Sequence, residues 1–390
     1  MNPVWNISVK MEAYLDNSAT TRVDPEAAEL MNKIYLEDWG NPSSLHIKGF
    51  EAQKYLRDAY KTFSKLLRCP EKEIYFTSGG TESNNTAIIG AAFGNRRRAK
   101  HIITTKIEHE AVLQPFKFLE EREYETDYLS VDEKGHIDPD ELSRLLRPDT
   151  LLVSIMHVNN EVGSLEPVHE AGKLIKEISP GCLFHVDDVQ GFGKLRLIPK
   201  ENNIDLLSVS AHKLHGPKGC GLLYMKEGSK VSPIVYGGGQ QRGFRSGTEN
   251  VAGIAGFALA AEKLCKNMDD NFAKYTGLRD CFNDNLKGLD DIKINGGDVP
   301  YIISLTVFGV RAEVLLHALE ERGIYVSSGS ACASNRPAVS ETLKAMGAGK
   351  EALDSTIRLS LCADNTEEEM KYAAENIKEL TVKLRQFVRR

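Results

Sequence analysis

The sequence lacks the features that mark membrane, secreted and nucleic-acid-binding proteins. It contains no apolar run of the roughly 18 residues that a membrane-spanning helix needs. Residues 1–17 do not combine a charged start with an apolar stretch, so no secretory signal is expected. Lys and Arg number 49 against 55 Asp and Glu, and the net charge of −6 argues against general nucleic-acid binding. We therefore expect a cytoplasmic protein that binds neither membranes nor nucleic acid directly.

Cysteine usage gives a second exclusion. The seven cysteines are an odd number, are spread along the chain and form no Cys-x-x-Cys pair. This pattern is typical of reduced cytosolic thiols and not of a disulfide framework or a structural zinc site. With 41% hydrophobic and 27% charged residues, the composition is that of a globular protein, and 390 residues suffice for two or three domains.

Helical and strand patterns alternate over the first two thirds of the chain. Apolar residues at three- and four-residue steps predict helices at 25–37, 50–67 and 81–93, the last capped by Thr81. Short apolar runs predict strands at 101–104, 151–156, 183–186, 204–209 and 221–224. Because continuous apolar runs suit strands buried on both faces of a mainly parallel sheet, the expected class is α/β.

The last third of the chain has a different pattern. Helical periodicity runs from about residue 250 to 286. Strands at 302–307, 324–327 and 356–361 then alternate with helices at 311–322 and from 366 onward. We expect a smaller α+β unit here, with the boundary inside the long helix near Cys265.

The strongest local signal for chemistry is Lys213, which directly follows the apolar run 204–209. The carboxyl ends of strands are where open α/β sheets bind ligands. Desolvation at such a place lowers the pKa of a lysine, and a neutral amine can form a Schiff base. A surface lysine in a loop is the plain alternative.

Asp187 ends the preceding strand pattern. A carboxylate there could hold the protonated pyridine nitrogen of pyridoxal phosphate (PLP). The alternatives are a helix cap, or a metal site formed by His185, Asp187, His212 and His215. We rank the metal site lower because no ligand spacing matches a known template.

Two glycines and a threonine, Gly79-Gly80-Thr81, stand at the expected start of a helix. Free backbone N–H groups and the helix dipole favour an anion such as phosphate at such a position. A simply capped helix has the same pattern.

Cys332 lies in the small, polar, glycine-containing segment 327–334. Such a thiol is expected to be accessible, whereas most cysteines are buried and inert. Arg358 stands in the otherwise apolar segment 356–360 and needs an anionic partner if it is buried. That partner could be a substrate carboxylate or an internal carboxylate, and the sequence leaves both open.

In this order, the motifs resemble those of the cysteine desulfurases of the NifS/IscS type, in the class V aminotransferase family of fold-type I PLP enzymes. The resemblance extends from Tyr14 to about Glu369. The matching segments are 14–21, 40–44, 108–109, 156–163, 212–219 and 245–248. It implies a mainly parallel seven-stranded sheet in a large PLP-binding domain, 21–265. It also implies a smaller α+β domain, 1–20 plus 266–390, that carries the catalytic cysteine loop.

The resemblance also implies roles for single residues. Lys213 looks like the Schiff-base lysine, His109 like the histidine that stacks on the ring and moves protons, and Cys332 like the nucleophile. Asp187 matches the partner of the pyridine nitrogen, and Gln190 the residue that contacts the phenolic oxygen. The other matches are Gly80, Thr81, Ser210 and His212 for the phosphate, Thr248 for the phosphate of the other subunit, and Asn160 and Arg358 around the substrate carboxylate.

The expected reaction converts L-cysteine to L-alanine and leaves a persulfide on Cys332. The expected assembly is a homodimer with shared active sites. The sulfur acceptor is expected to be an iron–sulfur scaffold or a tRNA-thiolation enzyme. Because the sequence ends at Arg390 without the extended tail associated with scaffold docking, the two acceptors stand about equal.

Two places depart from the family pattern: Asp188-Val189 replaces a common Ala-Thr pair, and Cys362 stands where glycine is frequent. Three alternatives also remain open. They are another class V PLP lyase or aminotransferase, a non-catalytic scaffold of the same fold, and a metal hydrolase.

Overall fold

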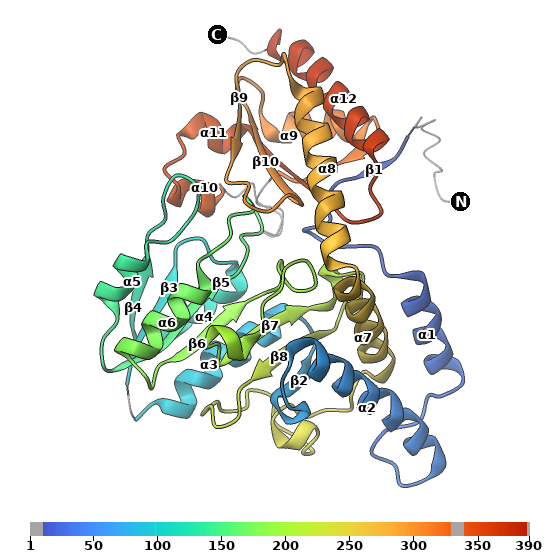
Figure 1. Cartoon of the computed structure of the whole chain (residues 1–390), viewed down its shortest axis with the longest axis vertical. Coiled ribbons are helices and arrows are strands. Elements are labelled where there is room, and N and C mark those ends of the chain that lie inside the picture. The colour runs from blue at the N-terminus through green and yellow to red at the C-terminus, as the bar shows by residue number, and fades with distance from the viewer. Residues whose placement is uncertain (1–10, 98, 329–338, 388–390) are drawn as a thin grey trace.

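A seven-stranded sheet forms the centre of the larger part of the molecule in the computed structural model, which describes residues 11–97, 99–328 and 339–387 (Figure 1). The strand order is β2-β8-β7-β6-β5-β3-β4. The strands are β2 (Ile74–Thr77), β3 (His101–Thr105), β4 (Glu125–Leu129), β5 (Thr150–Met156), β6 (Leu183–Asp187), β7 (Leu206–Ser210) and β8 (Gly221–Met225). Strands β7, β6, β5, β3 and β4 run parallel, and β8 is antiparallel to both its neighbours. The expected α/β class with a mainly parallel seven-stranded sheet is confirmed.

Helices enclose this sheet, and the apolar runs of the strands explain why. Neighbouring strand residues such as Leu152 and Val153 belong to different hydrophobic clusters, one on each face of the sheet. Both faces therefore need apolar side chains, which removes any polar alternation from the strands. The helices of this part are α1 (Pro25–Leu36), α2 (Ile47–Leu67), α3 (Gly80–Asn95), α4 (Glu110–Glu120), α5 (Pro139–Leu145), α6 (Val168–Ile178) and α7 (Val251–Lys266).

A second unit with its own core lies at the other end of the molecule (Figure 1). Its antiparallel sheet has the order β12-β10-β9, and β1 pairs in parallel with β11. Its strands are β1 (Ala13–Tyr14), β9 (Ile292–Asn295), β10 (Ile302–Val307), β11 (Ile324–Tyr325) and β12 (Thr356–Ser360). Its helices are α8 (Met268–Leu286), α9 (Ala312–Glu320), α10 (Glu341–Ala345), α11 (Lys350–Ser355) and α12 (Glu367–Arg385). Separate cores support the predicted division into domains 21–265 and 1–20 plus 266–390, which stays a prediction.

Four short 3₁₀ turns complete the regular structure of the described residues. They are η1 (Glu71–Glu73), η2 (Pro199–Asn202), η3 (Ala211–Lys213) and η4 (Gln241–Gly243). None of the helices in the described ranges combines the length and hydrophobicity that a bilayer span requires.

Two local predictions were wrong. The helix expected over 250–286 is two helices that meet at Asn267, which has non-helical dihedral angles. Thr81 does not cap α3, because the helix already begins at Gly80 and its N-cap is Gly79. Gly79 has φ 156° and ψ −179°, a conformation essentially restricted to glycine, and it turns the chain from β2 directly into the helix.

Candidate active site

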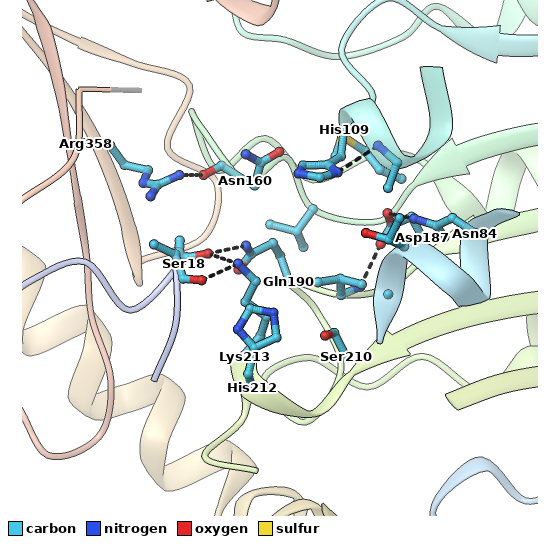
Figure 2. A pocket seen from close by; sticks show the side chains of 17 residues that line it. Ser18, Asn84, His109, Asn160, Asp187, Gln190, Ser210, His212, Lys213 and Arg358 are labelled. Carbon is cyan, nitrogen blue, oxygen red and sulfur yellow. Dashed lines mark hydrogen bonds between the residues drawn. The ribbon is translucent and has the colours of Figure 1, made fainter. Parts of the chain in front are cut away.

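A cavity of about 210 Å³ lies at the carboxyl ends of β5, β6 and β7, where open α/β sheets bind ligands (Figure 2). The structure brings ten of the predicted residues to its walls. They are Gly80, Thr81, His109, Asn160, Asp187, Gln190, Ser210, His212, Lys213 and Arg358. These side chains come from both parts of the molecule, because Arg358 belongs to β12 and the others to the larger part.

Lys213 enters the cavity from η3, directly after β7. Its Nζ donates to the carbonyl oxygens of Ser18 and Ala19, at 2.5 and 2.7 Å. The Ser18 carbonyl also accepts from Nε2 of Gln190 at 3.1 Å (Figure 2). A short N-terminal segment therefore holds the amine at the cavity wall.

Asp187 closes the far wall of the cavity, at the end of β6. Its Oδ2 accepts from Nδ2 of Asn84 at 2.7 Å and its Oδ1 from the backbone N–H of Val189 at 3.0 Å, both neutral donors. Burial raises the pKa of this carboxyl, against the opposing effects of these bonds, His109 and Lys213. A cationic group in the cavity would therefore stabilise the ionised form of Asp187.

The N-terminus of α3 forms an anion cradle at one end of the cavity. The first N–H groups of a helix have no partner within it, and its dipole favours negative charge. A Cβ atom added to Gly80 would lie 2.9 Å from Val189 Cγ2 and 3.4 Å from Ser210 Cβ, so only glycine keeps this approach open. Glu82 in the first turn does not oppose an anion with a free charge, because Arg245 binds it at 2.8 and 3.0 Å.

Two histidines face the cavity in defined states. Nδ1 of His109 accepts from the backbone N–H of Ala111 at 3.0 Å, so the neutral ring carries its proton on Nε2. Burial, together with the charges of Lys213 and Lys218, lowers the pKa of His212 to about 4. His212 is therefore a neutral neighbour of the lysine at physiological pH.

Arg358 has the internal carboxylate partner that the sequence left open, and it also lines the cavity. The side chain is 3% exposed, and its Nη2 binds Oδ1 of Asp16 at 2.8 Å. Its Nη1 donates to the carbonyl oxygen of Asn160 at 2.9 Å (Figure 2). Its Nε is buried and has no hydrogen-bond partner among the described residues.

Some predicted residues lie elsewhere. Thr248 is exposed and is not part of the cavity wall. Cys332 lies outside the described residues. Cys362 is buried, and burial raises the pKa of its thiol. Asp188 points away from the cavity and binds Nδ1 of His157 at 2.6 Å.

The histidines of the alternative metal site do not converge. His185 lies buried between the hydroxyls of Ser154 and Ser208, and His215 binds the carbonyl oxygen of Arg22. No cluster of three or more His, Cys, Asp or Glu side chains suited to a metal occurs in the part of the chain that the structure describes.

Sequence reasoning missed three participants: Asp16, Ser18 and Asn84. Asn84 carried a readable signal, because it lies four residues after Gly80 and thus on the same face of α3. Asp16 and Ser18 stood inside a segment that resembles the family, but no local pattern assigned them a role.

The comparisons with known proteins show the family of this chain. The model of the class-V aminotransferases matches residues 13–372. The chain belongs to the class-V aminotransferase family. "Cysteine desulfurase IscS" of Dictyoglomus turgidum is 42% identical over 97% of this chain and 96% of its own length. The protein of the same name from Methanosarcina thermophila is 42% identical over 97% and 95%.

Solved structures give the same result. A structure titled as a NifS-like protein superposes with a TM-score of 0.90 at 38% identity, covering 95% of this chain and 99% of its own. A structure of DndA from Streptomyces lividans has a TM-score of 0.76 at 35% identity, covering 90% and 99%. The predicted family and its fold type are therefore confirmed.

Enzymes of this family depend on PLP, which confirms the predicted cofactor. The cavity fits this group. The glycine-lined N-terminus of α3, a buried carboxylate with no cationic hydrogen-bond donor among the described residues, and the amine of Lys213 all lie on its wall. The buried Oε1 of Gln190 also has no hydrogen-bond partner among the described residues.

Proposed function

We propose that the protein is a PLP-dependent cysteine desulfurase that converts L-cysteine to L-alanine and keeps the sulfur as a persulfide on Cys332. The observation that carries the proposal is that Lys213, Asp187 and Arg358 line one cavity. That combination offers an amine for covalent attachment, a counter-charge for a pyridinium and a cation for an amino-acid carboxylate. The names of full-length relatives at 42% identity support the same reaction.

The residues that hold PLP in this proposal are those of the cavity. Lys213 attaches it covalently, Asp187 binds the pyridine nitrogen and Gln190 the phenolic oxygen. His109 covers the ring, and Gly80, Thr81, Ser210 and His212 bind the phosphate. When bound, PLP supplies an electron sink next to the α-carbon of the substrate.

The chain's own groups then carry out the remaining tasks. Arg358 and Asn160 hold the substrate carboxylate, and Lys213 removes the α-proton. The thiolate of Cys332 attacks the substrate sulfur, and the carbon–sulfur bond breaks with its electron pair left on carbon. Protonation of that carbon, for which Nε2 of His109 carries a suitable proton, and return of the α-proton from Lys213 then give L-alanine. Cys332 keeps the sulfur until an acceptor removes it.

The proposal includes a homodimer. Exposed apolar side chains gather on α1, the start of α2 and the loop between them, at Tyr35, Leu36, Trp39, Leu45, Ile47 and Phe50. Exposed apolar side chains gathered on neighbouring segments favour an interface. Exposed Thr248 then reaches the phosphate in the partner subunit's site. Light scattering on the purified protein tests this, and a monomer at micromolar concentration would contradict it.

The proposed location is the cytoplasm, and the proposed acceptors are an iron–sulfur scaffold or a tRNA-thiolation enzyme. The relatives named IscS favour iron–sulfur assembly.

The test is incubation of the purified protein with L-cysteine and a thiol reductant, with alanine and sulfide measured together. Equal amounts of both products, lost in Cys332→Ala and kept in the matched control Cys362→Ala, support the proposal. Pyruvate and ammonia with sulfide would identify a β-eliminating lyase. Transfer of the amino group to a keto acid would identify an aminotransferase. A protein that binds no PLP on reconstitution would be a non-catalytic scaffold.

A further inference from the structure

The ion pair between Asp16 and Arg358 joins two segments of the smaller unit that are 342 positions apart in the sequence. Asp16 belongs to the N-terminal segment that also supplies the carbonyls of Ser18 and Ala19 to Lys213. Arg358 belongs to β12. The pair is largely dry, because the two side chains are 19% and 3% exposed.

The backbone around Asp16 is fastened to β12 beside the arginine. Asp16 itself forms a parallel bridge with Ser360. The backbone N–H of Ser18 donates to Oγ of Ser360 at 2.7 Å, and Nδ2 of Asn17 donates to the Ser360 carbonyl at 3.0 Å. The backbone that carries the Asp16 carboxylate is therefore fixed relative to Arg358 by three contacts that do not involve the arginine.

The guanidinium uses two of its nitrogens on this frame. Nη2 binds Asp16 and Nη1 binds the carbonyl oxygen of Asn160, so two acceptors from different segments define the plane of the group. Nε is buried without a partner among the described residues. A guanidinium has five donors in a fixed fork, so the donors left over have a set direction once two nitrogens are held.

We propose that Asp16 is a positioning residue, which holds Arg358 in the orientation that binds the carboxylate of the amino-acid substrate. This inference rests on the role given to Arg358 in the proposed function. Preorganisation of this kind increases affinity because the arginine does not lose rotational freedom when the substrate binds. Asp16 also supplies the counter-charge that a buried guanidinium needs while no substrate is present.

Three substitutions separate orientation from charge. Asp16→Ala removes the acceptor and the charge. Asp16→Asn keeps an oxygen at the Oδ1 position and loses the charge, whereas Asp16→Glu keeps the charge and displaces it by one methylene. If orientation matters, Asn retains substrate affinity and both Ala and Glu lose it. Glu379→Ala, which breaks the more exposed pair with Arg322 in the same unit, is the matched control.

The experiment compares the binding of L-alanine with that of L-alaninamide, which lacks the carboxylate, to the PLP-loaded protein. Binding is followed by the change in the visible absorption of the bound cofactor, so that no turnover is needed. We expect Asp16→Ala to weaken L-alanine binding by about tenfold or more, the scale of one charge-assisted hydrogen bond. The same variant should bind L-alaninamide as the unmodified protein does. Asp16→Asn should stay within about threefold for both compounds.

Several results would overturn the inference. One is that Asp16→Ala binds L-alanine as tightly as the unmodified protein does. Another is that its affinities for L-alanine and L-alaninamide fall equally, which would mean general damage to the cavity. Asp16→Asn could weaken L-alanine binding as much as Asp16→Ala does, while Asp16→Glu binds it normally. That result would mean that only the charge of residue 16 matters. Unmodified protein that binds both compounds equally would overturn it together with the role of Arg358. If thermal melting shows that Asp16→Ala is not folded, the binding of Asp16→Asn and Asp16→Glu tests the inference instead. The binding experiment can be carried out even if the protein does not release sulfur from L-cysteine. A failure of the proposed function can therefore be distinguished from a failure of this inference.

Discussion

Nζ of Lys213 lies 2.5 Å from the carbonyl oxygen of Ser18, 195 positions earlier in the chain. This contact fastens the N-terminal segment over the amine that is proposed to attach the cofactor. Because backbone carbonyls accept the hydrogen bonds, no substitution of Ser18 removes them. The contact is therefore tested by substituting Lys213.

Lys213→Met should abolish covalent attachment of PLP. Borohydride reduction of the loaded protein, followed by peptide mapping, should place the cofactor on Lys213 in the unmodified chain and nowhere in the variant. Lys218→Met, an exposed lysine five positions further on, is the control and should label normally. Label on another lysine in the unmodified protein would refute the assignment.

Asp187→Asn should keep the cofactor attached but slow turnover by roughly 100-fold or more, the scale of losing one preorganised electrostatic contact to the reacting system. Asn84→Ala removes the 2.7 Å bond to Asp187 and should cost roughly tenfold. Turnover and the absorption spectrum are measured on the same samples. Full activity in Asp187→Asn would show that the carboxylate does not serve the pyridine nitrogen.

Asp187 and Lys213 also show what the sequence could and could not predict. Asp187 and Lys213 stand at the ends of strands, and the rule that ligands bind there depends only on local pattern and topology. The partner of Asp187, however, is Asn84, which lies 103 positions away. Its spacing places it on the same face of α3 as Gly80, but nothing in the sequence pairs it with Asp187. Asp16, which is 342 positions from Arg358, was missed for the same reason.

The fold follows the same division. The central strands were predicted because their two buried faces produce continuous apolar runs. β4, at the sheet edge, is half exposed and carries Glu125 and Asp127, so it has no such run. The break at Asn267 was missed because apolar spacing continues on both sides of it. Local sequence does not predict features that depend on packing between segments far apart in the chain.

Glu108 should behave as a buried neutral acid. Its Oε1 accepts from the backbone N–H of Met156 and from Thr105, while Oε2 has no partner among the described residues. Burial, and then the charge of Asp187, raise its pKa well above 4.5. The folded protein therefore keeps this proton to higher pH than the unfolded chain, and stability falls as pH rises above 4.5 toward the raised pKa.

Glu108→Gln mimics the protonated acid and removes this titration. Relative to the unmodified protein, the variant should therefore gain stability as the pH is raised. Urea unfolding from mildly acidic to alkaline pH measures the difference. Parallel curves for the two proteins would show that Glu108 is ionised in the folded state.

His185 should make the protein sensitive to acid. Burial between Ser154 and Ser208 lowers the pKa of its imidazole from 6.5 to about 3. Below pH 6.5 the imidazole is protonated in the unfolded chain but stays neutral in the folded protein. The stability of the fold therefore decreases as the pH is lowered from 6.5 to about 3. The slope is about 1.4 kcal/mol per pH unit.

His185→Gln should reduce that acid sensitivity, whereas the control His169→Gln, at an exposed histidine, should not. The measurement is the free energy of unfolding at several pH values between 3 and 7. An unchanged slope in His185→Gln would show that His185 does take up a proton in the folded protein.

The central claim is that the sulfur of L-cysteine passes to Cys332, and the most direct test is to find that sulfur. PLP-loaded protein is mixed with one equivalent of L-cysteine without reductant, digested and examined by mass spectrometry, with alanine measured in parallel. The account predicts one additional sulfur atom on the peptide that contains Cys332, and an equal amount of alanine. Sulfur on the Cys362 peptide, or free sulfide with no persulfide on any cysteine, would contradict it.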